Sequence, residues 1–107
     1  MAHLSEVEML TMAAIAHLGP GAYGVSIREE IERRTGRSLS IGSLYKAIHR
    51  LQKQGFLSVT VGAPTGVRGG RAKKLVELEP AGRAALESSI HALYSMVEGL
   101  EGEWKVT

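Results

Sequence analysis

Residues 40–55 read SIGSLYKAIHRLQKQG, a segment in which the start, the end and both faces of a helix are visible. Ser40 is a favoured N-cap residue, and Gly55 is a favoured residue just beyond a helix C-terminus. We therefore predict an amphipathic helix with one apolar and one basic face. The apolar face consists of Ile41, Leu44, Tyr45, Ile48 and Leu51. The opposite face carries Gly42, Ser43, Lys46, His49, Arg50 and Lys53.

Two helices are predicted before this one. Ser5 and Glu8 have the spacing of a capping box, which begins a helix over residues 5–18. This helix is apolar nearly all round, so it is predicted to be buried on two sides. In so short a chain we expect one of these sides to face another subunit, with Leu10 among the contacts. A second helix is predicted over residues 24–34.

A β-hairpin is predicted after the basic helix. Residues 56–61 and 72–79 read as two strands, and the loop that joins them is rich in glycine and basic residues. Pro80 then suits the first position of a last helix.

The last helix carries an apolar seam. Its apolar residues recur at alternating gaps of four and three, the pattern of a helix that pairs with another helix. The other three helices and the hairpin already provide a core for the domain. We therefore expect the apolar residues of the last helix to contact another subunit and not their own domain. The seam consists of Leu86, Ile90, Leu93, Val97, Leu100 and Trp104.

This order of elements predicts a fold that is mainly α with a small β-hairpin (α+β), a winged helix-turn-helix plus a C-terminal dimerisation helix. We expect residues 1–79 to form a winged-helix DNA-binding domain. Residues 80–107 are expected to form the dimerisation helix, as part of the same compact unit. In this arrangement residues 40–55 are the recognition helix, which reads the major groove from its N-terminal half.

The charge pattern favours a polyanionic partner. The net charge is only +2, but the window from 33 to 76 holds ten basic residues and no acid. Such segregation is expected when one face of a protein meets nucleic acid. The basic residues are Arg33, Arg34, Arg37, Lys46, Arg50, Lys53, Arg68, Arg71, Lys73 and Lys74.

Candidate DNA-binding residues on the recognition helix are Ser40, Gly42, Ser43, Tyr45, Lys46 and Arg50. Small side chains let the helix approach the duplex, and hydroxyls and free N–H groups at a helix start bind phosphate. Lys46 and Arg50 suit either guanine edges or phosphates. Tyr45 is interpreted either as a plain core aromatic or as an edge residue whose hydroxyl reaches a phosphate.

Candidate DNA-binding residues on the hairpin are Arg68, Arg71 and Lys73. Gly69-Gly70 between the two arginines would let the loop follow the DNA backbone or enter the minor groove. Neighbouring residues of a strand point to opposite faces, so only one of Lys73 and Lys74 is expected to face DNA.

The composition argues against catalysis, a metal site or a cofactor. The chain has neither cysteine nor aspartate, and its four histidines are scattered without metal-ligand spacing. The N-terminus has no signal-peptide pattern, and no apolar run is long enough to span a membrane. We therefore expect a cytoplasmic protein with no membrane partner, no catalytic residue, no metal and no cofactor.

Four segments together resemble the PadR family of transcription regulators, although none of them is specific alone. They are Leu39–Leu51, Tyr23-Gly24, Gly69–Lys74 and Leu78–Arg83. The resemblance implies a homodimer built on the last helix, which binds a palindromic operator in double-stranded DNA, usually to repress. It also implies a response to a small-molecule inducer, which the sequence does not identify. By motif position it assigns DNA contact to Ser40, Gly42, Ser43, Tyr45 and Lys46.

The chain departs from the family pattern in its last helix. Drug-binding members have a tryptophan near the middle of this helix, whereas this region offers Leu93 and Tyr94, and Trp104 lies near the C-terminus. We therefore do not carry over a drug site. The alternative to a DNA-binding regulator is a winged-helix module that binds a protein or a small ligand without specific DNA recognition. The acid-free basic window argues against that alternative.

Overall fold

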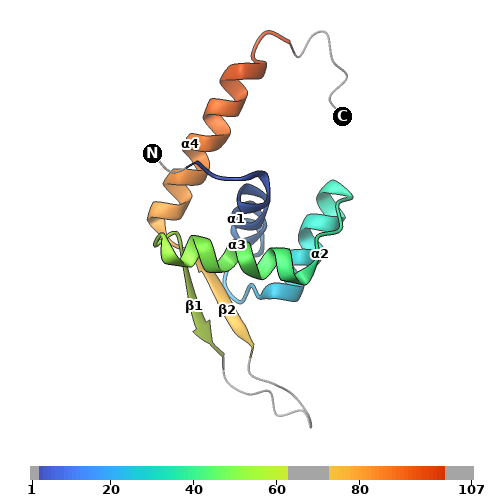
Figure 1. The fold of residues 1–107 in the computed structure, drawn as a ribbon, viewed down its shortest axis with the longest axis vertical. Coiled ribbons are helices and arrows are strands. Elements are labelled where there is room, and N and C mark those ends of the chain that lie inside the picture. Colours follow the sequence, from blue (N-terminus) through green and yellow to red (C-terminus); the bar gives the residue numbers. More distant parts are fainter. Residues whose placement is uncertain (1–2, 63–72, 101–107) are drawn as a thin grey trace.

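The computed structural model describes residues 3–62 and 73–100. Within these ranges the chain forms four helices and one antiparallel hairpin (Figure 1), which confirms the predicted α+β class and order of elements. The elements are α1 (Glu6–Leu18), α2 (Gly24–Thr35), α3 (Ile41–Lys53), β1 (Leu57–Val61), β2 (Lys74–Leu78) and α4 (Pro80–Val97).

The helix ends follow the predicted signals. The Ser5 hydroxyl accepts a hydrogen bond from the Glu8 backbone N–H at 3.1 Å, and the Glu8 carboxylate accepts one from the Ser5 N–H at 2.8 Å. The Ser40 hydroxyl accepts from the Ser43 N–H at 3.1 Å, which caps α3. Gly55 follows α3 with a φ of 78°, a left-handed conformation that glycine adopts without strain.

The core lies between the first three helices and one face of the hairpin. Leu57 pairs with Leu78 and Val59 with Val76, so these four side chains share the sheet face that packs on the helices. Burying each large apolar side chain contributes about 1.5–3 kcal/mol. The most deeply buried apolar side chains are Met12, Ile15, Ile27, Leu44, Leu51 and Val76.

The hairpin is also tied to the start of α2. The Val76 N–H donates to the Ala22 carbonyl at 2.8 Å, and Tyr23 forms an isolated bridge with Leu75. Residues 22–23 thereby run alongside β2 and hold the wing at a fixed place beside the helices. This pairing has no signature in the sequence, because it joins segments about fifty residues apart.

The start of α4 packs closely on the chain that leads into β1. A Cβ on Gly82 would lie 2.2 Å from the Phe56 carbonyl oxygen, so only glycine allows this approach. The same carbonyl accepts a hydrogen bond from the Glu79 N–H at 2.9 Å. In Figure 1, α4 rises from this point away from the hairpin and beyond the other helices. The first turns of α4 are therefore fixed to the domain, whereas its later turns extend past it.

The C-terminal end of α4 lies within the stretch predicted to carry the apolar seam. The helix ends at Val97, and Leu100 lies beyond it, after Gly99 with a φ of 91°. Glycine is among the poorest helix formers, which accounts for this end. Trp104 lies outside the described residues. Within residues 3–62 and 73–100, no helix is both long enough and apolar enough to cross a bilayer.

Candidate nucleic-acid interface

α3 presents a continuous exposed face that is small and basic. Leu44, Ala47, Ile48 and Leu51 are buried, and the opposite positions are exposed. Helical spacing places the centre of the exposed face at Gly42, Lys46 and His49, with Lys53 at the C-terminal end. No described element covers this face in Figure 1, where α3 crosses the molecule.

The first turn of α3 leaves groups that can bind an anion. The Ser40 hydroxyl donates to the Ser43 hydroxyl oxygen at 2.8 Å while it accepts from the Ser43 N–H. The hydroxyl proton of Ser43 therefore remains available to a phosphate oxygen. The first N–H groups of a helix also lack intrahelical partners and favour negative charge. Ser40 acts as the cap, and Ser43 presents the donor.

Tyr45 lies across the first residue of α2. A Cβ on Gly24 would come within 2.5 Å of the Tyr45 hydroxyl oxygen, so the ring rests directly on the glycine backbone. The side chain is 46% exposed, which is not the environment of a core aromatic. Its position agrees with the interpretation of Tyr45 as an edge residue, and a phosphate contact by its hydroxyl remains a prediction.

The two wing lysines lie in different surroundings. Lys74 lines a hollow of about 280 Å³ between α3 and the sheet, which it shares with Tyr45, His49 and Gln52. Lys73 instead places its ammonium 4.1 Å from the centre of the Tyr23 ring, a cation–π contact. Lys74 is thus the lysine beside α3, whereas the sequence prediction had chosen Lys73. DNA contact by Lys73 remains a prediction, and Arg68 and Arg71 lie outside the described residues.

Three residues of this region were absent from the sequence-based set. His49 and Gln52 follow Tyr45 by four and seven positions, so the helical repeat could have found them. Lys74 precedes the buried Val76 by two positions, so strand alternation could have placed it on the helix-facing side of the sheet. These three residues are thus marked by their spacing along the helix and the strand and not by their charge.

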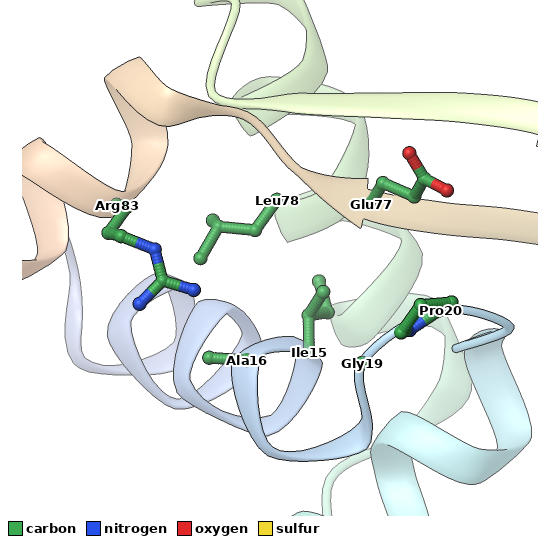
Figure 2. Close-up of a pocket in the computed structure, with 7 residues that line it drawn as sticks. All are labelled: Ile15, Ala16, Gly19, Pro20, Glu77, Leu78 and Arg83. Atoms are coloured by element: carbon green, nitrogen blue, oxygen red, sulfur yellow. The ribbon is translucent and has the colours of Figure 1, made fainter.

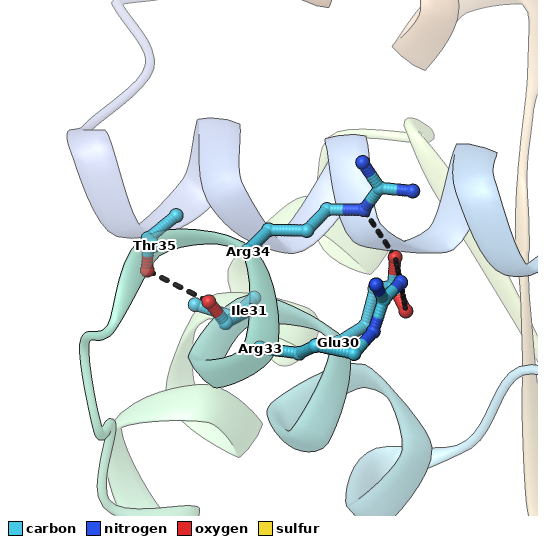
Figure 3. Close-up of polar contacts among 5 residues, drawn as sticks. All are labelled: Glu30, Ile31, Arg33, Arg34 and Thr35. Carbon is cyan, nitrogen blue, oxygen red and sulfur yellow. Dashed lines mark hydrogen bonds and ion pairs between the residues drawn. The ribbon is translucent and has the colours of Figure 1, made fainter. Parts of the chain in front are cut away.

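Acidic residues from outside the basic window form ion pairs with some of its arginines. The Glu30 carboxylate accepts hydrogen bonds from Arg33 at 2.7 and 2.8 Å and from Arg34 (Figure 3). One turn further along α2, the Thr35 hydroxyl donates to the Ile31 carbonyl. The bonds from Arg33 and then Arg34 lower the pKa of Glu30 from 4.5 to about 2.

Arg37 forms an ion pair with Glu6 at the start of α1. The basic window therefore carries less free positive charge than its composition indicates, because acids from outside it pair with Arg33, Arg34 and Arg37. Of the described basic residues of the window, Lys46, Lys53, Lys73 and Lys74 make no ion pair, and all four are exposed. Within the window, the cations without an ion pair therefore lie on α3 and beside the start of β2.

Two other hollows lie away from α3. One of about 250 Å³ lies between the end of α1, β2 and the first turn of α4, where Arg83, Leu78 and Ile15 line it (Figure 2). A larger and mostly apolar hollow of about 730 Å³ lies between the N-terminal segment, α1 and α4. Neither has a lining residue from α2 or α3, so both are separate from the exposed basic face.

The chain matches the model of a known protein family. The family model described as "Transcriptional regulator PadR-like family" matches residues 14–88, which include α2, α3, the hairpin and the first half of α4. The transcriptional regulator Rv3488 of Mycobacterium tuberculosis is 34% identical over 80 residues, which is 75% of this chain and 70% of that protein.

Solved structures share the fold. A transcriptional regulator from Clostridium thermocellum superposes with a TM-score of 0.75 at 18% identity, covering 96% of this chain and all of that one (100%). A winged-helix DNA-binding protein of STIV superposes with a TM-score of 0.72 at 20% identity, covering 92% of this chain and 98% of that one. These similarities establish the winged-helix fold, in which α2 and α3 are the helix-turn-helix and β1–β2 the wing.

Proposed function

Because the chain belongs to the PadR-like family of transcriptional regulators, we propose that it binds a specific palindromic operator as a homodimer and represses transcription. The observation that carries the DNA-binding part is the exposed basic face of α3 beside Lys74 of the wing. The protein is proposed to act in the cytoplasm, where operator DNA is accessible.

The recognition helix is proposed to enter the major groove with Gly42 and Lys46 toward the bases. Gly42 has open space around it, since a Cβ there would meet nothing within 4 Å, so the DNA can occupy that space. Lys46 has no ion-pair partner among the described residues and can donate to guanine edges or to phosphates. The Ser43 hydroxyl, the Tyr45 hydroxyl and the Lys74 ammonium border this face and fit contacts to the sugar-phosphate backbone.

The dimer is proposed to form through α4 with help from α1. Leu93 is 57% exposed and Met96 is 77% exposed in the single chain, on the part of α4 that extends past the domain. Both line the apolar hollow of about 730 Å³, together with Met9 of α1. Large exposed apolar surface of this kind marks an interaction site. A second copy of α4 fits, because its gaps of four and three suit packing against an identical helix.

Residues 1–79 are accordingly proposed to be the DNA-binding part, and α4 with the residues that follow it the dimerisation part. Two-fold symmetry would place the two α3 helices about one turn of DNA apart, roughly 34 Å, which requires a palindromic operator. A small-molecule inducer is proposed to bind between the two α4 helices of the dimer. A ligand there would alter the angle between the two α4 helices and therefore the spacing of the two recognition helices.

Fluorescence anisotropy tests the proposal. Labelled duplex from upstream of the gene is compared with a shuffled duplex of the same composition across a salt series. We expect tight binding that prefers the native duplex and weakens steeply with salt, because phosphate contacts release counterions. Equal and weak binding to both duplexes that vanishes near physiological salt would refute specific recognition. It would favour the alternative, a module that binds a protein or a small ligand.

A further inference from the structure

Glu8 is an unusual residue on the buried face of α1, since it is a carboxylate only 4% exposed among apolar neighbours of the core. One of its oxygens, Oε1, accepts the capping hydrogen bond from the Ser5 N–H. The other, Oε2, is buried and accepts no hydrogen bond in the described part of the chain. A buried carboxylate oxygen without such a partner is unfavourable, so a compensating cation is expected nearby.

That cation is Arg50 of the recognition helix. Its Nε lies 4.0 Å from Glu8 Oε2, too far for a hydrogen bond but close enough for an ion pair. The Arg50 side chain is 68% exposed, so much of it remains open to solvent. A guanidinium has five N–H donors in a planar fork, which allows one edge to face a carboxylate while the other donors face outward. The contact joins α1 directly to the basic side of α3.

We propose that Glu8 is a positioning residue for DNA binding: its buried carboxylate holds the Nε side of Arg50 while the Nη groups contact a DNA phosphate. This inference rests on the proposed function. A long arginine side chain loses conformational freedom when it binds, and a fixed anchor removes part of that cost. Arg50 does not leave Glu8 in the complex, because departure would strand a buried unpaired charge.

The chain allows the charge of Glu8 to be removed without its capping role. Glutamine also completes a capping box, so Glu8→Gln keeps the acceptor for the Ser5 N–H and removes only the negative charge. Arg50→Lys keeps the positive charge but replaces the fork by one ammonium, which cannot face Glu8 and a phosphate from two sides. Glu6→Gln is the matched control, because Glu6 lies in the same turn of α1 but pairs with Arg37.

The first readout needs no DNA. In the full-length protein, the NMR resonance of the Arg50 Nε–H group reports its surroundings. We expect this resonance to shift in Glu8→Gln and to stay in place in Glu6→Gln. An unchanged resonance in Glu8→Gln would overturn the inference whether or not the protein binds DNA.

The second readout is duplex affinity in a double-mutant cycle. We expect Glu8→Gln to weaken binding of the native upstream duplex by roughly three- to tenfold, which corresponds to the entropy cost of immobilising one long side chain on binding. In the Arg50→Lys background the same change should alter affinity by less than about twofold. Glu6→Gln should have the same effect whether residue 50 is arginine or lysine. Urea unfolding of each variant reports whether the fold is retained.

Three results in this cycle would overturn the inference. Equal weakening by Glu8→Gln in both backgrounds would mean that Glu8 acts through the fold. Unchanged affinity would mean that Arg50 needs no anchor, and tighter binding would mean that Glu8 competes with DNA for Arg50. If the wild-type protein bound no duplex at all, the proposed function would fail. A shift of the Arg50 resonance in Glu8→Gln would then mean that the Glu8–Arg50 ion pair exists but contributes only to the fold.

Discussion

Replacing Gly82 by alanine should destabilise the protein, although alanine is the better helix former. Gly82 is in the first turn of α4, and a Cβ there would lie 2.2 Å from the Phe56 carbonyl oxygen and 3.0 Å from a methyl carbon of Leu78. The first contact is with a backbone atom, which cannot rotate away as a side chain could. The start of α4 must therefore shift away from Phe56. Overpacking of this kind costs about 1–3 kcal/mol, against a gain of at most about 1 kcal/mol from helix propensity.

The net effect should therefore be a loss of up to about 3 kcal/mol. For a domain of this size, each kcal/mol lost lowers the Tm by roughly 4–8 °C. Urea unfolding followed by far-UV circular dichroism measures it. Gly42→Ala is the matched control, since Gly42 is also in the first turn of its helix and a Cβ there meets nothing within 4 Å. We expect that control to hold or gain stability. A Gly82→Ala variant as stable as Gly42→Ala would refute the close contact between the start of α4 and the Phe56 backbone.

Three further outcomes follow from the same structure. Leu93→Glu should raise the dissociation constant of the proposed dimer by at least about a hundredfold in sedimentation equilibrium, because a symmetric interface loses two buried leucines. An unchanged dissociation constant would exclude Leu93 from the dimer interface. The pKa of Glu30 is lowered to about 2 from 4.5, so its contribution to stability should be complete above pH 4.5 and lost as the pH falls toward 2. The difference in urea midpoint between wild type and Glu30→Gln should shrink across that window, and a constant difference would contradict the assigned pKa. Lys74→Ala should reduce the salt slope of duplex binding by about 0.9, the value for one phosphate contact, and should do so more than Lys73→Ala. The reverse order would favour the sequence-based choice of Lys73.

The sequence predicted the elements well because their signals are local. The caps at Ser5 and Ser40 and the stop at Gly55 each depend on residues within one turn of the helix they delimit. The ion pairs of Glu30 with Arg33 and Arg34 were also accessible, because residues three and four apart are neighbours on a helix.

Tertiary contacts were not accessible in the same way. The pairing of Glu6 with Arg37 and the approach of Glu8 to Arg50 both depend on how α1 crosses the helix-turn-helix. The sequence therefore overestimated the free positive charge of the basic window. It also could not show that Lys73 packs on the Tyr23 ring, although strand alternation with Val76 could have placed Lys74 on the side of the sheet that faces α3.

Duplex binding by a Lys46→Ala variant provides the decisive comparison for recognition through α3. Lys46 lies at the centre of the exposed face and makes no ion pair with any described residue, so its removal should leave the fold and the oligomeric state unchanged. We expect affinity for the native upstream duplex to fall about tenfold or more. Lys53→Ala, at the far end of the same helix, should change it much less. A Lys46→Ala protein that binds the native duplex as tightly as wild type would contradict the assignment of α3 as the recognition helix.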